Sequence, residues 1–492
     1  MTMPIWLDKR ASLTPGRTAI EAGNVQLSFA QLRQQAQGVA TKLLNKGLEE
    51  RAVLACLSES SVALVVLVHS IPYTGACLMP LNTRLTVHEL LYQLQDSGCK
   101  FLVYSDSYAD TAARLKQELN HLTLVSLAEL QALSTAAAAS RQLLHDVEEQ
   151  AVYTIMYTSG TTGHPKGVLQ SYNNHWSSAV GSMLNLGLST QDKWLLAVPM
   201  FHISGLSILM RSVIYGIAVV IQERFDPKEA NEAIMSQGVT VMSVVSNMLV
   251  RMLEQLGERR YPQAFRCMLL GGGPAPLPLL ETCVEKGIPV VQTYGMTETC
   301  SQFATLQPEY MLTKIGSAGK PLFQGELRIL QDGQVMSAGE AGEIVVRGPN
   351  VTSGYLNQAS ADSFEQGWLH TGDVGYLDEE GFLYVLDRRK DMLISGGENV
   401  YPAEIEAVLM SHPEVLEAGV TSTEHEVWGQ SPIAFVVLRQ ENVVNQEKLL
   451  EHCKARLAKY KLPIAIHTVR ELPRNAAGKL LRRELTKLLP IT

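Results

Sequence analysis

The stretch YTSGTTGHPKG, residues 157–167, has the composition of a phosphate-binding loop. Its glycines, its serine and threonines and its lysine can surround an anion with backbone N–H groups, hydroxyl groups and one positive charge. In the commonest such loop the lysine follows a glycine and precedes a serine or threonine. Here Lys166 follows Pro165 and precedes Gly167. The spacing therefore indicates a phosphate chemistry other than that of the common P-loop proteins.

Four further motifs lie far apart along the chain. They are LLGGGPAP (269–276), QTYGMTET (292–299), WLHTGD (368–373), and a C-terminal pair made of DRRKD…ISGGENVYPAEIE (387–406) and PRNAAGKLLRREL (473–485). The glycine run leaves room for a flat ring against the backbone, and the other motifs contain carboxylates, hydroxyls, an aromatic ring and a lysine. One glycine-rich loop is weak evidence of function, but five motifs must be explained together.

In this order the motifs resemble those of the adenylate-forming enzymes, which include acyl-CoA synthetases, peptide-synthetase adenylation domains and firefly luciferase. The resemblance covers nearly the whole chain and implies ATP, Mg²⁺ and coenzyme A as cofactors or substrates. It implies two half-reactions. A carboxylate attacks the α-phosphate of ATP and expels pyrophosphate, and a thiol then displaces AMP from the acyl-adenylate. Because an anion must approach a polyanion, catalysis rests on positioning and electrostatic stabilisation.

The resemblance also implies the residues that bind ATP. These residues are Thr158, Ser159, Gly160, Thr161, Thr162, Lys166, Gly271, Gly272, Gly273, Pro274, Tyr294, Gly295, Met296, Thr297, Asp373, Arg388 and Lys479. The first loop would wrap the β- and γ-phosphates, Tyr294 would stack on the adenine, and Asp373 would accept hydrogen bonds from both ribose hydroxyls. Arg388 would assist at the ribose or the phosphate.

Four residues are implied as catalytic. Thr297 would reach the α-phosphate, and Glu298 would hold Mg²⁺, which prefers few carboxylates together with phosphate oxygens. Lys479 would bridge the attacking carboxylate and the phosphate. It lies in a glycine-containing turn near the C-terminus, so domain movement must bring it in. His202 matches the gate beside the acyl pocket, with a core histidine as the alternative.

Four more residues are implied for the second half-reaction. Asp387 matches the hinge about which the C-terminal domain reorients, and hinge residues need not touch substrate. Gly396 and Gly397 would line the tunnel for the pantetheine arm of coenzyme A, and Lys390 lies between hinge and tunnel in the sequence. A solvated run of charges is the alternative for residues 387–391.

The stretch VPMFHISGLSILMRSVIYG, residues 198–216, is implied as the acyl-specificity segment. The candidate substrate residues are His202, Ser204, Gly205, Arg211 and Ser301. Arg211 is the informative one, because an arginine within an apolar run must extend to the surface, pair internally or bind a ligand. A second carboxylate on the substrate would match its forked guanidinium, whereas a fatty acid would leave the charge unpaired. An internal salt bridge is the alternative.

Residues 157–216 resemble most closely the o-succinylbenzoate–CoA ligases of menaquinone biosynthesis, whose substrate is an aromatic dicarboxylic keto acid. NNHW (173–176) strengthens the likeness without a physical role that the sequence reveals. We therefore expect a ligase that converts 2-succinylbenzoate, ATP and CoA into 2-succinylbenzoyl-CoA, AMP and diphosphate. The alternatives are a medium-chain fatty or aromatic acyl-CoA ligase, a luciferase-like side activity, and a non-catalytic nucleotide-binding protein. Glu298 and Lys479 argue against the last, because a binding module needs neither.

The bulk composition is consistent with such an enzyme. The 492 residues, 46% of them hydrophobic and 18% charged, are typical of a soluble globular protein, and a formal charge of −8 argues against general nucleic-acid binding. Seven dispersed cysteines favour reduced thiols and argue against zinc. The N-terminus lacks a signal-peptide core, and Arg211 interrupts the apolar run 203–221. We expect a cytoplasmic protein without a membrane span, and the resemblance implies a homo-oligomer.

The motifs require a scaffold of alternating strands and helices. AVYTIMYTS (151–159) reads as a buried strand that runs into the phosphate loop, and strand–helix alternation continues to about residue 315. This rhythm predicts an α/β fold of stacked layers with largely parallel sheets. Short strands and turns over about 315–386 predict a β-rich, barrel-like subdomain. We expect an N-terminal domain of residues 1–386 and a small, mobile α+β C-terminal domain of residues 387–492.

Overall fold

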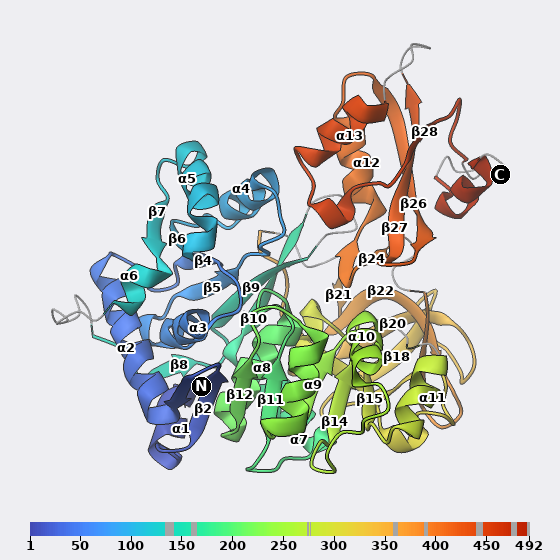
Figure 1. Cartoon of the computed structure of the whole chain (residues 1–492). Coiled ribbons are helices and arrows are strands. Elements are labelled where there is room, and N and C mark those ends of the chain that lie inside the picture. The colour runs from blue at the N-terminus through green and yellow to red at the C-terminus, as the bar shows by residue number, and fades with distance from the viewer. Residues whose placement is uncertain are drawn as a thin grey trace. The chain divides into compact units, whose positions relative to one another are not determined.

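The computed structural model describes residues 1–132, 142–158, 165–272, 275, 277–357, 363–387, 392–438, 446–473 and 480–489. The chain divides into two compact units (Figure 1). The first comprises residues 1–83, 96–156 and 168–386, and the second comprises residues 84–95, 157–167 and 387–492. The sequence did not indicate that the two short segments 84–95 and 157–167 group with the C-terminal residues.

A six-stranded sheet contains the strand that precedes the phosphate loop. Its order is β10 (Lys166–Ser171), β9 (Val152–Thr158), β5 (Cys77–Pro80), β4 (Val53–Leu57), β6 (Phe101–Tyr104) and β7 (Thr123–Ser126). The pairs from β9 to β7 are parallel, as expected for strands joined by helical crossovers. The connecting helices are α3 (Val62–Thr74), α4 (Val87–Asp96) and α5 (Ala109–Glu118). The predicted strand before the loop is confirmed as β9.

The segment 27–48 contains helix α2 (Phe29–Asn45). The helix begins after Ser28, whose hydroxyl accepts a hydrogen bond from the backbone N–H of Gln31, while the Gln31 side chain accepts one from the Ser28 N–H. This reciprocal pair satisfies two N–H groups that the first turn leaves without partners. Local sequence therefore sets where α2 begins.

Within the described residues, the larger sheet has fifteen strands, and a run of parallel strands forms its middle. In spatial order these are β15 (Val290–Met296), β14 (Cys267–Leu270), β13 (Val241–Val244), β11 (Lys193–Leu196), β12 (Ala218–Ile221) and β2 (Thr18–Ala22). β3 (Val25–Ser28) pairs antiparallel with β2 at the edge. The predicted alternation of strands and helices with largely parallel sheets is confirmed.

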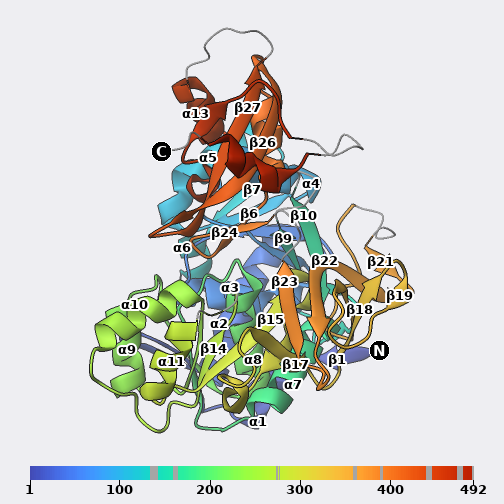
Figure 2. The same cartoon turned by 90° about the vertical axis from the view of Figure 1, so that its right-hand side faces the viewer.

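Two hydrophobic cores cover the two faces of these parallel strands. Trp194 and Leu196 of β11 face the main core, which also contains side chains of the six-stranded sheet and of α1 (Trp6–Leu13), α2, α3, α7 (Tyr172–Leu186) and α8 (Ile203–Tyr215). Leu195 faces the other core, formed with α9 (Pro227–Ser236), α10 (Ser246–Leu256) and α11 (Leu277–Glu285) (Figure 2). The alternation follows from the two-residue period of a strand.

Antiparallel strands continue the large sheet beyond β15. β16 (Ser301–Leu306) and β17 (Ser317–Pro321) lead to β23 (Leu383–Asp387), β22 (Trp368–Leu377), β20 (Gly342–Arg347), β18 (Glu326–Gln331) and β19 (Gln334–Val335). The short strand β21 (Phe364–Glu365) pairs with β22. The predicted β-rich region is confirmed, and within the described residues its strands follow an open path joined to the parallel strands.

The second unit contains an α+β arrangement over most of residues 392–489. Its sheet consists of β25 (Glu398–Val400), β24 (Leu393–Ser395), β27 (Gly429–Leu438), β26 (Val415–His425) and β28 (Ile466–Thr468). The helices α12 (Pro402–Met410) and α13 (Gln446–Lys454) share a hydrophobic core with these strands. Gly396 and Gly397, at φ +59° and +83°, form the tight turn between β24 and β25, a conformation that favours glycine at both positions.

The apolar run 203–221 forms α8 and β12 inside the first unit. Within the described part of the chain, no helix is both long and apolar enough to cross a bilayer. All seven cysteines are buried as free thiols.

Candidate active site

The carboxyl ends of neighbouring parallel strands carry three of the predicted motifs. β11, β13, β14 and β15 lie side by side and run in one direction, so these ends meet at one edge of the sheet. The segment 198–216 follows β11, the glycine run follows β14, and QTYGMTET ends β15. Ligands of open α/β sheets bind in the crevice outside this edge. The fold therefore places these motifs where a nucleotide and an acid could meet.

The glycine run begins where β14 ends. Gly271 donates its backbone N–H to the carbonyl of Val244 at 3.1 Å, and Gly272 has φ +87°. A Cβ at residue 272 would lie 3.1 Å from Cγ1 of Val245, so a side chain there meets both strain and a close neighbour. Glycine thus keeps the backbone at this edge uncovered, as the prediction of an adenine site requires.

Tyr294 and Asp373 are brought together from β15 and β22. The Tyr294 hydroxyl donates a hydrogen bond to Oδ2 of Asp373 at 2.7 Å, and both side chains are buried. The Tyr294 ring packs in a hydrophobic cluster with Phe303 and Leu369. The observed contact shows that Tyr294 orients the carboxylate predicted to bind the ribose, while its stacking on adenine stays a prediction.

The turn after β15 is strained. Cys300 and Ser301 have φ +52° and +97°, a region that residues with side chains rarely occupy. The backbone folds back so closely that a Cβ at Gly295 would lie 1.9 Å from the carbonyl oxygen of Ser301. Such strain persists only where surrounding contacts enforce it, and it is typical of functional sites.

Replacing Gly295 by alanine is expected to lower the thermal unfolding midpoint of the first unit by at least about 4 °C, because the added Cβ forces the turn open. Gly38 is a matched control, since it lies within α2 and a Cβ there meets nothing within 4 Å. Gly38→Ala should leave the midpoint unchanged or raise it by about 2 °C. Calorimetry of both variants checks this, and equal midpoints would contradict the strained turn.

Glu298 lies in the same turn, within the short helix η2 (Thr297–Thr299). Its side chain is 3% exposed, its Oε1 accepts a hydrogen bond from the Tyr355 hydroxyl at 3.0 Å, and its backbone carbonyl accepts one from the N–H of Thr352. Within the described residues, no three His, Cys, Asp or Glu side chains cluster as metal ligands do. A single buried carboxylate such as that of Glu298 would suit Mg²⁺ that takes its remaining ligands from phosphate and water.

Arg211 is buried in α8 with 1% of its surface exposed. Its Nη2 lies 3.3 Å from the Ser301 hydroxyl, and its guanidinium carbon lies 5.1 Å from the centroid of the Trp194 ring. Its Nε has no hydrogen-bond partner within the described residues. Burial lowers the pKa of Arg211, and Tyr215 and neighbouring thiols oppose the shift.

No carboxylate of the described residues pairs with Arg211. The internal salt bridge considered from the sequence is therefore not found in this part of the chain. An arginine stays protonated even when buried, so its charge is retained without a counterion. The geometry brings this charge to Ser301, another predicted substrate residue.

The other predicted acyl-pocket residues lie at the start of α8. His202 precedes the helix, is half-buried, and packs edge-on against Phe201 with ring centroids 4.7 Å apart. Ser204 is exposed and lies seven residues before Arg211, so the two share one helix face. A Cβ at Gly205 would lie 2.3 Å from the carbonyl oxygen of Pro199, which shows how closely α8 approaches the segment after β11.

Several predicted residues lie outside the described part of the chain. They are Ser159, Gly160, Thr161, Thr162, Gly273, Pro274, Arg388, Lys390 and Lys479. Thr158 ends β9 and Lys166 begins β10, so these strands deliver both ends of the phosphate loop. Asp387 is the last residue of β23. The roles of all these residues stay predictions.

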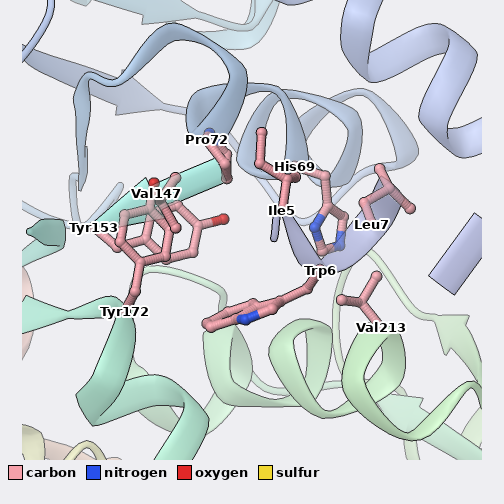
Figure 3. Close-up of a pocket in the computed structure, with 9 residues that line it drawn as sticks. All are labelled: Ile5, Trp6, Leu7, His69, Pro72, Val147, Tyr153, Tyr172 and Val213. Atoms are coloured by element: carbon pink, nitrogen blue, oxygen red, sulfur yellow. The ribbon is translucent and has the colours of Figure 1, made fainter. Parts of the chain in front are cut away.

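A small cavity of about 10 Å³ lies elsewhere, in the main core (Figure 3). Its walls include Trp6, His69, Tyr153 and Tyr172, but none of the predicted site residues. The Tyr172 hydroxyl has no hydrogen-bond partner within the described residues. The space suits about one water molecule, so we assign it no part in binding an acid or a nucleotide.

The structure also reveals residues that the sequence did not single out. The side-chain amide of Gln170 donates to the Thr297 carbonyl at 2.7 Å, and Tyr355 holds Glu298. His175 contacts Thr154. The stretch NNHW, which contains His175, was the one sequence signal that pointed to this region.

Comparison with known families decides the affiliation. The model for AMP-binding enzymes matches residues 7–356, and the model for the AMP-binding enzyme C-terminal domain matches residues 404–479.

The chain belongs to the AMP-binding enzyme family.

This AMP-binding enzyme is 57% identical to the 2-succinylbenzoate–CoA ligase of Geobacillus kaustophilus, with 100% of the chain and 99% of the relative covered. A double mutant of the o-succinylbenzoate CoA synthetase of Bacillus subtilis, bound to a product analogue, has a TM-score of 0.94 at 48% identity, with 99% of each chain covered. The same synthetase with ATP and magnesium has a TM-score of 0.77 at 48% identity, with 99% and 100% covered. The predicted family and fold class are confirmed.

Proposed function

We propose that this AMP-binding enzyme is an ATP-dependent 2-succinylbenzoate–CoA ligase. The observation that carries the proposal is the buried charge of Arg211, which has no carboxylate partner in the described part of the chain. The full-length likeness to 2-succinylbenzoate–CoA ligases supports the same substrate.

Arg211 bears on the choice of substrate through its buried charge. Burying a guanidinium costs free energy unless hydrogen bonds and an opposite charge compensate. The Ser301 hydroxyl and the Trp194 ring compensate in part, and the Nε donor is left over. A carboxylate on the substrate would supply the missing charge and accept from the fork. An acid that carries a second carboxylate therefore suits this site better than a fatty acid.

The described residues support the following roles in the first half-reaction. Asp373, oriented by Tyr294, would hold the ribose of ATP, and Thr297 would contact the α-phosphate. Mg²⁺, when bound, supplies positive charge that offsets the approach of two anions, and Glu298 would hold it. The acid would lie along α8, with Arg211 fixing its second carboxylate.

A pyrophosphate-release assay with ATP, Mg²⁺ and CoA tests the function. We expect kcat/KM for 2-succinylbenzoate to exceed that for benzoate, and for fatty acids from hexanoate to dodecanoate, by at least about 100-fold, because an unpaired Arg211 penalises the monocarboxylates. Preference for a fatty acid would favour the acyl-CoA ligase alternative. If ATP binds but none of the acids leads to pyrophosphate release, a non-catalytic nucleotide-binding protein would be favoured.

We also propose that the enzyme works in the cytoplasm, where its substrates ATP and CoA occur, and that it forms a homo-oligomer. The free thiols of all seven cysteines are consistent with a reducing compartment.

A further inference from the structure

Helix α7 carries the stretch NNHW, and its His175 is 1% exposed. Both ring nitrogens of His175 have partners. Nε2 lies 2.8 Å from the Thr154 hydroxyl of β9, and Nδ1 lies 3.2 Å from the Cys300 thiol in the strained turn. The imidazole thus bridges the strand that leads to the phosphate loop and the turn that contains Glu298.

The contacts continue beyond Thr154. Its hydroxyl donates to Oε1 of Gln170 at 2.8 Å, and Nε2 of Gln170 donates to the carbonyl of Thr297 at 2.7 Å. Thr154 and Gln170 are fully buried. If one of these hydrogen-bonding groups is removed, water therefore cannot take its place unless a new cavity forms.

The donors and acceptors in this series of hydrogen bonds can be arranged in only one direction. The Thr297 carbonyl can only accept, so the amide nitrogen of Gln170 faces it and the amide oxygen faces Thr154. The Thr154 hydroxyl gives its one proton to that oxygen. His175 must then donate from Nε2, which leaves the lone pair of Nδ1 to accept from the Cys300 thiol.

The charge state of His175 suits this direction. Burial lowers the pKa of His175 to about 3, so the imidazole is neutral at neutral pH. A neutral ring is required, since an imidazolium has no lone pair with which to accept a hydrogen bond.

The two ends of this series of hydrogen bonds hold the two ends of the strained turn. Gln170 fixes the Thr297 carbonyl before Glu298, and His175 fixes the Cys300 thiol after it. The neighbouring Asn174 supports the same turn indirectly. Its amide donates to the carbonyls of Pro349 and Val351, at 2.9 Å each, and so holds the loop that contains Asn350 and Thr352.

That loop contacts the turn directly. The Asn350 amide donates to the carbonyl of Thr299 at 2.9 Å, and the Thr352 N–H donates to the carbonyl of Glu298 at 2.8 Å. NNHW therefore acts on the turn from two sides, through His175 and through Asn174. Nothing in these contacts requires the acid or the nucleotide to be bound.

We propose that His175 is a positioning residue for acyl-adenylate formation. Through Thr154, Gln170 and Cys300 it sets the conformation of the Thr297–Ser301 turn, and hence the places of the Thr297 hydroxyl, the Glu298 carboxylate and the Ser301 contact of Arg211. The inference rests on the proposed function for the identity of the reaction, but the geometry of the turn does not depend on which acid reacts.

Two matched pairs of variants test this series of hydrogen bonds. Thr154→Val removes the hydroxyl and keeps the shape of the side chain, whereas Thr154→Ser keeps the hydroxyl. Cys300→Ala and Cys300→Ser differ in the same way. We expect Thr154→Val and Cys300→Ala to lower kcat for adenylate formation by about tenfold to hundredfold, with KM for the acid changed less than about threefold. The serine variants should keep kcat within about threefold of wild type.

A control separates positioning from general destabilisation. Tyr261→Phe removes a part-buried hydrogen bond to Asn231, beside the core formed with α9, α10 and α11. It should lower the thermal midpoint as Thr154→Val does, yet leave kcat unchanged. Equal kcat values for Thr154→Val and Thr154→Ser would overturn the proposal, as would a matching fall in kcat for Tyr261→Phe.

A spectroscopic measurement tests the inferred tautomer of His175 without any acid substrate. In the ¹⁵N-histidine NMR spectrum of the nucleotide-free enzyme, with His175 assigned by comparison with His175→Gln, we expect the neutral tautomer protonated at Nε2 at pH 7. A proton on Nδ1, or an imidazolium, would contradict the inferred direction. If wild type fails to release pyrophosphate with 2-succinylbenzoate, the proposed substrate is wrong, while the tautomer still tests the positioning of the turn.

Discussion

Replacing Lys479 by alanine is expected to slow acyl-adenylate formation by at least about 100-fold, because the attacking carboxylate and the α-phosphate lose the positive charge that the family resemblance places between them. Thioester formation from supplied acyl-adenylate and CoA should stay within about threefold of wild type, since that step involves no attack on a phosphate of ATP. Pyrophosphate release and CoA-thioester formation, assayed separately, check the two steps.

Lys487→Ala is the matched control for Lys479→Ala. Lys487 is a largely exposed lysine eight positions further along, and it pairs with Glu484 on the same short helix. Its loss should affect neither half-reaction, because exposed ion pairs contribute little. If Lys479→Ala slowed both half-reactions equally, the assignment of this lysine to the first step alone would be wrong.

Replacing Arg211 by alanine is the second change with a large expected effect. We expect kcat/KM for 2-succinylbenzoate to fall by about 100-fold, mainly through a higher KM, because the second carboxylate loses its buried partner. The two monocarboxylic analogues, 4-oxo-4-phenylbutanoate and 2-butyrylbenzoate, each keep one carboxylate. For whichever of them the wild type accepts, the same substitution should change kcat/KM by less than about threefold.

Arg211→Lys sharpens this test. Lysine keeps the charge but not the planar fork, so we expect an intermediate loss with the dicarboxylic acid. Steady-state kinetics of both variants with each acid provide the comparison. Equal losses with dicarboxylic and monocarboxylic acids would remove Arg211 from the acyl pocket and leave it a structural role beside Trp194.

Much of the fold could be predicted from the sequence because its signals are local. The strand before the phosphate loop, the capped helix α2 and the change to short antiparallel strands after residue 315 each follow from patterns within a few residues. The same holds for the family motifs, since each is a contiguous run. Their joint placement was not readable, because it depends on the order β15, β14, β13, β11 within the sheet.

In the candidate site, too, the sequence predicted the features that depend on short motifs and not those that depend on distant contacts. The sequence indicated Glu298 and Asp373 by motif, but not that Tyr355 and Tyr294 hold their carboxylates, because these partners lie 57 and 79 residues away. The strain at Cys300 was equally hidden, since it arises from the close return of the chain past Gly295.

The reaction class of this chain follows from the sequence, because the residues predicted to bind phosphate, ribose and magnesium occur in short runs whose chemistry is set by side-chain type. The tertiary structure decided two other matters. It left Arg211 buried without a carboxylate in the described part of the chain, and it joined NNHW to the Glu298 turn. Both depend on contacts between segments far apart in the chain. Burial and hydrogen-bond partners are properties of packing that a linear pattern does not contain.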